Sequence, residues 1–194
     1  GWDAADAKRL AARTEPLTVR RGLAGCGLDL DRFETGAWFS EGTKNQGMRK
    51  EKGGKPAEVK TPDDTTAAII SEFNDGKPDL FITSGHATER DWQIGYSYKN
   101  GQFRCQEGRI FGIDLANKAF AMESPNPKVY LASGNCRMGL VPDRDAMAVA
   151  FIHSGGVHQM IGYVVSTWYG AAGWGTRDYF MVAGLPLADA FHAN

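Results

Sequence analysis

Two stretches of this sequence each end in a residue type that can do acid–base or nucleophilic chemistry. Residues 128–139, KVYLASGNCRMG, begin with an apolar, β-rich run and present Cys136 after a short polar turn. Residues 79–83, DLFIT, have the same layout and lead through Ser-Gly to His86. Each pattern is typical of a buried strand that stops at a small-residue turn. If the two strands are parallel neighbours, the thiol and the imidazole lie together at their carboxyl ends, where α/β sheets bind ligands, and can act as nucleophile and base.

The rest of the chain predicts the elements that would position these two residues. Helix and strand patterns alternate, which favours an α/β fold with a mostly parallel central sheet and helices on both faces. The expected helices span residues 3–12, 65–74, 113–122, 144–153 and 176–183. Further strands are expected at 37–39 and 158–165, and the Asn-Gly pair at 100–101 predicts a hairpin between 96–98 and 102–104.

Composition bounds the class of protein. A chain of 194 residues with 42% hydrophobic and 23% charged residues is typical of a single globular domain, here 1–194. The 22 basic and 23 acidic residues leave a net charge of −1, which argues against a nucleic-acid partner. No apolar run approaches the ~18 residues that a membrane span requires.

Residues 41–62 are the best candidate for a long mobile loop. This segment is polar and contains four glycines, two prolines and six basic residues. We interpret these basic residues as part of a solvated loop, in preference to a phosphate or polyanion site.

The order and spacing of the two key residues are similar to those of a known class. A strand ending in Gly-His, followed 50 residues later by a strand ending in Cys136, resembles the caspase–gingipain–legumain class (clan CD) of cysteine peptidases, for which ~50 residues is typical of caspases. Cys136-Arg137-Met138-Gly139 is similar to the Cys-Arg-x-Gly of caspases. The downstream pattern of a helix, Gly155-Gly156 and a strand is similar to gingipain-like and CHAT-like domains. The resemblance covers roughly residues 67–175 and implies a caspase-like three-layer sandwich.

The resemblance also implies a mechanism, that of a cysteine endopeptidase. Cys136 would attack a peptide carbonyl to form a thioester acyl-enzyme, and His86 would activate the thiol and protonate the leaving amine. Backbone N–H groups of Ala87 and Cys136 would stabilise the oxyanion. Two positions depart from the family pattern, because Ala87 replaces the usual glycine after the histidine and Asn135 replaces the commoner alanine or serine before the cysteine.

Substrate recognition is expected from loops at the same edge of the sheet. By the family analogy, Trp168, Tyr169 and Trp174 would build part of the pocket for the residue before the cleaved bond. Glu89, Asp91 or Arg137 would set its charge, since an acidic pocket selects Arg or Lys and a basic one selects Asp. The partner is then a peptide or protein substrate. No cofactor or metal is expected. Calcium, and a secreted or periplasmic location, rest on the family analogy alone.

Alternatives remain open for the function and for the other candidate residues. The fold could serve as a catalytically inactive interaction module, which the alanine at position 87 would favour, or as a thiol acyltransferase or ligase. Cys26 and Cys105 lack a base in a matching setting, which favours structural roles, and they could also pair with each other. The other three histidines, at positions 153, 158 and 192, have no metal-type spacing.

Overall fold

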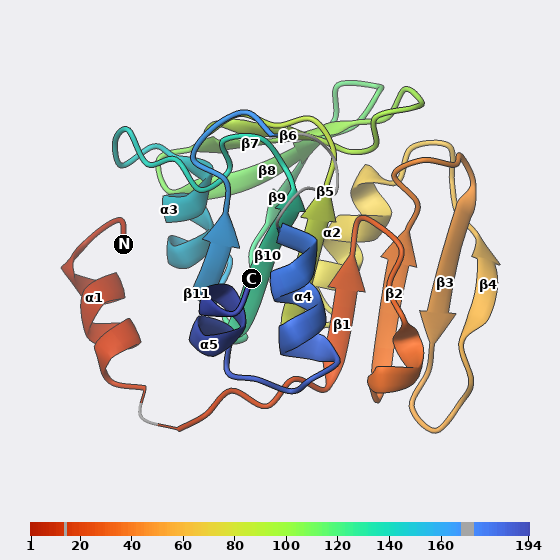
Figure 1. Ribbon diagram of the computed structural model, residues 1–194. Coiled ribbons are helices and arrows are strands. Elements are labelled where there is room, and N and C mark those ends of the chain that lie inside the picture. Colours follow the sequence, from red (N-terminus) through yellow and green to blue (C-terminus); the bar gives the residue numbers. More distant parts are fainter. Residues whose placement is uncertain (14, 168–172) are drawn as a thin grey trace.

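The computed structural model describes residues 1–13, 15–167 and 173–194. Within these residues a seven-stranded sheet forms the centre of the molecule, in the order β11-β10-β5-β1-β2-β3-β4 (Figure 1). The strands β11, β10, β5, β1 and β2 are parallel, and β3 and β4 are antiparallel additions at one edge. The bounds are β1 Arg21–Ala24, β2 Thr35–Phe39, β3 Gln46–Lys50, β4 Ala57–Lys60, β5 Leu80–Ser84, β10 Lys128–Gly134 and β11 Val157–Gly162. The predicted α/β class with a mostly parallel sheet is confirmed.

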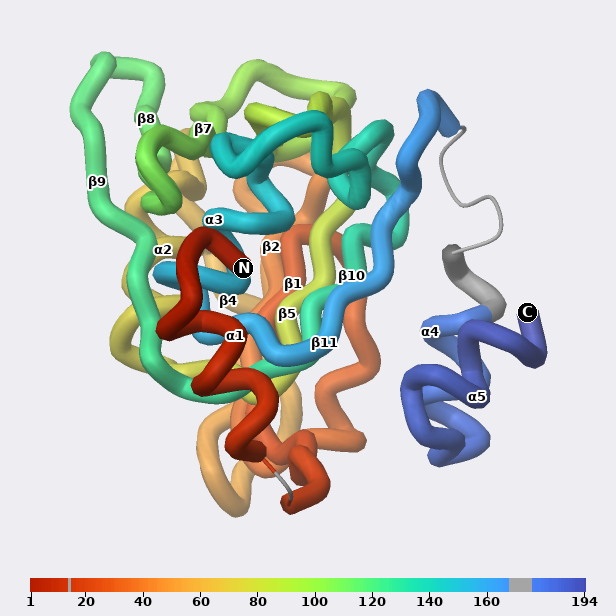
Figure 2. The backbone as a smooth tube through the Cα atoms, turned by 90° about the vertical axis from the view of Figure 1, so that its left-hand side faces the viewer, coloured from red at the N-terminus to blue at the C-terminus, as the bar shows by residue number. Residues whose placement is uncertain are grey.

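Helices lie on both faces of this sheet. The helices α2 and α3 cover one face and α4 and α5 the other, while α1 lies beside the edge strand β11 (Figures 1 and 2). The helix bounds are α1 Ala4–Ala11, α2 Thr66–Asn74, α3 Met147–His153, α4 Gly173–Met181 and α5 Leu187–His192, with a short 3-10 helix η1 at Leu30–Arg32. The helices expected at 3–12, 65–74, 144–153 and 176–183 therefore have counterparts within a few residues.

A second, antiparallel sheet covers the same face as α2 and α3 (Figure 2). Its strands are β6 Asp91–Gln93, β7 Gln102–Gln106, β8 Arg109–Ile113 and β9 Ala119–Met122. The helix predicted at 113–122 is wrong. Oδ1 of Asp114 accepts hydrogen bonds from the N–H groups of Ala116 and Lys118, and Asn117 adopts a left-handed φ of 62°. This side-chain turn reverses the chain into β9 instead of starting a helix.

The long loop predicted at 41–62 is also wrong, because β3 and β4 lie within it and form a hairpin against β2. Gly53 adopts a φ of 76° in the turn between them. β4 is mostly exposed, and Gly47 is the one buried residue of β3, so the apolar alternation is limited to Ala57 and Val59 in a segment of charged residues. Charged residues protect this outer edge from pairing with other chains.

The hydrophobic core has two parts, one on each face of the sheet. Toward α2 and α3, the Phe81 ring stacks on Tyr130 at 5.3 Å between ring centroids. Toward α4 and α5, the core contains Leu80, Ile82 and Leu131. All residues of β5 and β10 are buried. Burial on both faces explains why the middle of each strand, residues 80–82 and 129–132, appears in the sequence as an apolar run.

Asn100 connects the small sheet to the start of α2, and its removal is expected to destabilise the fold. Its buried Oδ1 accepts hydrogen bonds from the N–H groups of Thr65 and Gly101, and its Nδ2 donates to Oγ1 of Thr65. Asn100→Ala leaves buried polar groups unpaired and is expected to lower the free energy of unfolding by about 2–3 kcal/mol in urea denaturation. The exposed neighbour provides a control, since Lys99→Ala is expected to change stability by less than about 0.5 kcal/mol.

Candidate active site

Cys136 and His86 follow neighbouring parallel strands at the same edge of the sheet. Strand β10 pairs with β5, and the last pair of the register is Gly134 with Ser84. Each key residue therefore lies two positions beyond that pair. Neighbouring strands are about 4.8 Å apart, so the two chain segments that carry these residues leave the sheet at adjacent positions.

Gly85 and a backbone hydrogen bond from Gln93 fix the backbone at His86. Gly85 adopts a φ of 120°, and a Cβ at this position would lie 2.6 Å from the carbonyl oxygen of Gln93. The carbonyl of His86 in turn accepts a hydrogen bond from the N–H of Gln93 at 2.8 Å. The residue itself is exposed. The backbone of His86 is thus held while its imidazole faces solvent.

Alanine fits the backbone conformation at position 87. It forms an antiparallel bridge with Trp92, but the two hydrogen bonds of that bridge are made by the neighbouring residues, His86 and Thr88. In such a pair the N–H of the central residue points away from the partner strand. Ala87 is not among the residues with a positive φ, so alanine is unstrained there.

The thiol of Cys136 contacts the backbone of Thr167. The N–H of Thr167 donates to Sγ, and Sγ–H can donate to the carbonyl of Thr167, both at 3.3 Å. Within residues 1–13, 15–167 and 173–194, no hydrogen bond joins this Sγ to the imidazole of His86. Catalytic hydrogen bonds of unliganded enzymes often form only once substrate binds.

The turn after Cys136 is tied to the chain that follows β11. Arg137 adopts a left-handed φ of 55°, and its N–H donates to the carbonyl of Val165. The N–H of Gly139 donates to the carbonyl of Tyr163 at 2.8 Å. These bonds hold the turn at the end of β10 against the chain leaving β11.

Two of the charged residues expected to select substrate pair with each other. The guanidinium of Arg137 lies 3.0 Å from the carboxylate of Glu89, so their charges largely offset. The carbonyl of Glu89 also accepts the N–H of Met147 and so caps the start of α3. Asp91 lies in β6 opposite Arg104. This arrangement gives the site no strong net preference for an acidic or a basic side chain.

The aromatic candidates fall largely outside the described structure. Trp168 and Tyr169 lie outside the described residues. Trp174 lies within α4, and the description does not extend to its side chain.

The other two cysteines have surroundings unlike that of Cys136. All three cysteines are free, so the possible Cys26–Cys105 pair is not formed. Burial raises the pKa of the Cys26 thiol to about 12. Burial also raises that of Cys105 to about 11, despite the opposing charge of Arg90. Both are poor nucleophiles near neutral pH.

Sequence reasoning missed the role of two polar residues at this edge. Asn135 was noted only as a departure from the family pattern, yet its buried side chain bonds to Thr83 and to the carbonyl of Gly85. A signal was present, because Thr83 and Asn135 are polar residues at the ends of two apolar runs. The contact of Thr167 with Cys136 spans 31 residues and had no such signal.

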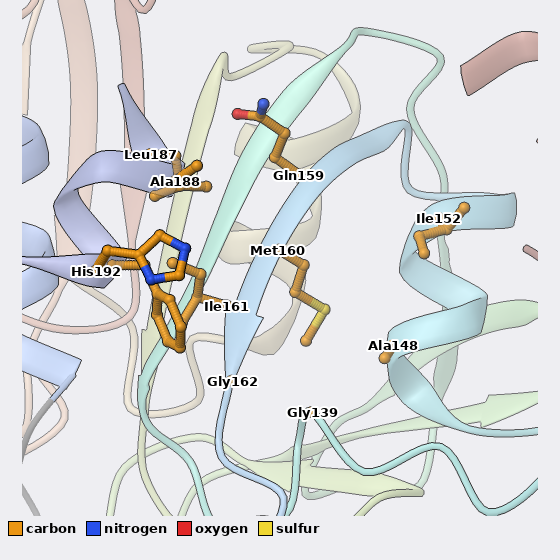
Figure 3. A pocket seen from close by; sticks show the side chains of 11 residues that line it. Gly139, Ala148, Ile152, Gln159, Met160, Ile161, Gly162, Leu187, Ala188 and His192 are labelled. Atoms are coloured by element: carbon orange, nitrogen blue, oxygen red, sulfur yellow. The ribbon is translucent and has the colours of Figure 1, made fainter. Parts of the chain in front are cut away.

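A pocket of about 560 Å³ lies away from these residues, along the outer edge of β11 (Figure 3). Figure 3 shows Met160 on the side of α3 and Ile161 on the side of α5. Gly139, three residues after Cys136, is the lining residue nearest in sequence to Cys136 or His86. Neither Cys136 nor His86 lines this pocket.

One side-chain cluster has metal-ligand atoms close together, but its members already bind one another. Ligand atoms of Asp3, Asp6 and His153 lie within 4.8 Å of each other among the described residues. The carboxylate of Asp6 accepts hydrogen bonds from the Trp2 N–H, from Arg9 and from His153. This cluster therefore fastens α1 to α3.

Comparisons with protein-family models, with curated proteins and with solved structures found no match for this chain. Separately, the described part of the chain contains no helix of the length and hydrophobicity that crossing a membrane requires.

Proposed function

We propose that this chain is a cysteine endopeptidase of the caspase–gingipain–legumain class, with a caspase-like fold, that uses Cys136 and His86. The observation that carries the proposal is the register of β10 and β5, in which both residues lie two positions beyond the pair Gly134–Ser84. The parallel strands also follow the order 2-1-3-4-5 along the sheet. In sheets of this order, ligands bind outside the carboxyl ends of the strands where the order reverses, here between β1 and β5, and His86 follows β5.

The proposed reaction has two steps. The thiolate of Cys136 attacks the peptide carbonyl carbon, and N–H groups of Ala87 and Cys136 stabilise the resulting oxyanion. His86, holding the thiol proton, delivers it to the amine as the C–N bond breaks and a thioester forms. Water then attacks the thioester while His86 takes its proton. The carboxylic acid leaves, and the proton returns to the sulfur.

A second candidate, an interaction module without turnover, is favoured by one contact. The Sγ of Cys136 is bonded to the backbone of Thr167 rather than to His86. In the endopeptidase, Thr167 must release the sulfur when substrate binds. In the module, this contact is permanent.

Alkylation by iodoacetamide is expected to separate the two candidates. Because only the thiolate reacts, a Cys136 activated by His86 is expected to react at pH 6–7 about 10²-fold faster than in His86→Ala. Peptide mass spectrometry reads all three cysteines in one sample. Cys26 and Cys105, whose pKa values are raised to about 12 and about 11, serve as internal controls.

Equal rates in the folded parent and in His86→Ala would contradict the endopeptidase and support the module. The same result would show that the two side chains do not act together even though their strands are adjacent.

A further inference from the structure

We propose that Asn135 is a positioning residue, which holds the backbone of His86 in register with Cys136. The inference rests on the proposed function, since it assigns a role in the same site. Asn135 directly precedes the nucleophile and is 0% exposed. Its Nδ2 donates to the carbonyl of Gly85 at 3.1 Å. The carbonyl of Gly85 and the N–H of His86 belong to the same peptide group. The hydrogen bond from Asn135 therefore fixes the orientation of the peptide plane that precedes His86.

The orientation of the Asn135 amide is determined by its partners. Its Oδ1 accepts from the hydroxyl of Thr83 at 2.5 Å. If the amide were flipped, Oδ1 of Asn135 would face the carbonyl oxygen of Gly85. Both atoms are acceptors, so neither could supply a proton to the other. Because the Thr83 hydroxyl donates its single proton to Asn135, the hydroxyl of Tyr130 must donate to Thr83, at 2.8 Å. A directed chain of hydrogen bonds therefore runs from Tyr130 through Thr83 and Asn135 to Gly85.

These side-chain hydrogen bonds begin where the backbone hydrogen bonds between β10 and β5 end. The register of β10 and β5 shifts between Ala132 and Gly134 and stops at the pair Gly134–Ser84. Beyond this point the described residues offer three side-chain links between the segments that follow the two strands. These are the buried amide of Asn135 and two ion pairs, Arg137–Glu89 and Arg90–Asp143, whose arginines are 42% and 46% exposed. Exposed ion pairs contribute little, so the buried amide is the stronger restraint.

The consequence for the reaction is geometric. A displacement of about 1 Å at a reacting group can cost about 10²-fold in rate. Asn135 does not contact substrate. It is expected to increase the reactivity of the Cys136 thiol by holding His86 in the position from which it activates the thiol.

The test measures how strongly Cys136 depends on His86. The alkylation rate of Cys136 at pH 6.5 is compared with and without His86→Ala, first in the parent and then in Asn135→Ala. The parent is expected to show a ratio of about 10², and Asn135→Ala a ratio below about 5, because a misplaced base gives little activation. Hydrogen exchange at the amides of His86 and Ala87 is expected to accelerate in Asn135→Ala.

Three variants of the same hydrogen-bond chain control for stability. Thr83→Val keeps the shape and removes one hydroxyl, so it is expected to lower the ratio about 3- to 10-fold, and it remains informative if Asn135→Ala does not fold. Thr83→Ser keeps the hydroxyl and is expected to restore the ratio. Tyr130→Phe removes the far end of the chain and is expected to destabilise the fold while leaving the ratio near that of the parent.

The outcomes are distinguishable. A parent ratio near 100 that persists in folded Asn135→Ala and Thr83→Val would overturn the positioning role and leave the proposed function intact. Faster exchange with an unchanged ratio would overturn it too, since Asn135 would then support local structure only. A parent ratio near 1 would overturn the proposed function itself, and with it any catalytic meaning of Asn135.

Discussion

Replacing Cys136 by alanine is expected to lower the rate of peptide hydrolysis by at least about 10³-fold, because no acyl-enzyme can form without the sulfur. The fold is expected to remain, since the side chain is only partly buried and its hydrogen bonds reach a backbone that solvent can satisfy. The measurement uses fluorogenic peptides that vary the residue before the cleaved bond, because Glu89 and Arg137 offset each other and do not indicate one preference.

Cys105 provides the matched control for this variant. It is also a free, partly buried cysteine, but it lies in β7, where its Sγ donates to the carbonyl of Asp145 at 3.0 Å. Cys105→Ala is expected to retain full activity. Hydrolysis by Cys136→Ala at the rate of the parent would contradict the assignment. Adding an amine to the parent reaction then separates a peptidase from an acyltransferase, since only the latter would give mainly the amide product.

Several parts of the fold could be predicted because their signal is local. The strands that carry His86 and Cys136 are buried on both faces, so each appears as an apolar run, and the turn residues mark where each run ends. Helix α2 is preceded by Asp63 and Asp64 and followed by Gly76, which are also local features. From these elements alone, the carboxyl edge could be identified as the position of the candidate site.

Other parts depend on contacts between distant residues and have no local signal. The hairpin of β3 and β4 is exposed, so its composition resembles that of a loop. The register that aligns Cys136 with His86 follows from the pairing of two strands about 50 residues apart, and only the structure gives it. The same holds for Asn135, whose partners lie 50 and 52 residues away. Short-range patterns therefore located the candidate residues Cys136 and His86 but not the distant groups that contact the turns carrying them.

Lys128 is buried, although its residue type predicts an exposed side chain. Lysine is usually exposed, yet this side chain, at the amino end of β10, is 0% exposed. Its Nζ donates to the carbonyls of Asn126 and Gly155 at 2.6 and 2.5 Å and lies 4.6 Å from the ring centroid of Phe73. Burial lowers its pKa to about 7, and the nearby charge of Asp79 opposes this shift only in part. The charges of Arg21 and Arg9 lower it further.

The pH dependence of stability is expected to report this burial. Between pH 7 and 10.5 the unfolded chain binds a proton on Lys128 that the folded chain does not, so the free energy of unfolding rises with pH in this window. Relative to Lys128→Met, the parent is expected to gain about 3 kcal/mol between about pH 7 and about pH 9.5. Urea unfolding of both proteins at each pH measures the difference, in which the other titrating groups, including Cys26, cancel.

Lys118→Met is the matched control, because Lys118 also lies over an aromatic ring, at 4.7 Å from the Phe120 centroid, but is exposed. Its stability difference from the parent is expected to stay constant with pH. A constant difference for Lys128→Met as well would contradict the prediction. It would mean that the two carbonyls and the Phe73 ring stabilise the ammonium enough to offset burial. The proton would then stay on Nζ throughout, and the amino end of β10 would contain a permanent buried charge opposite the end that carries Cys136.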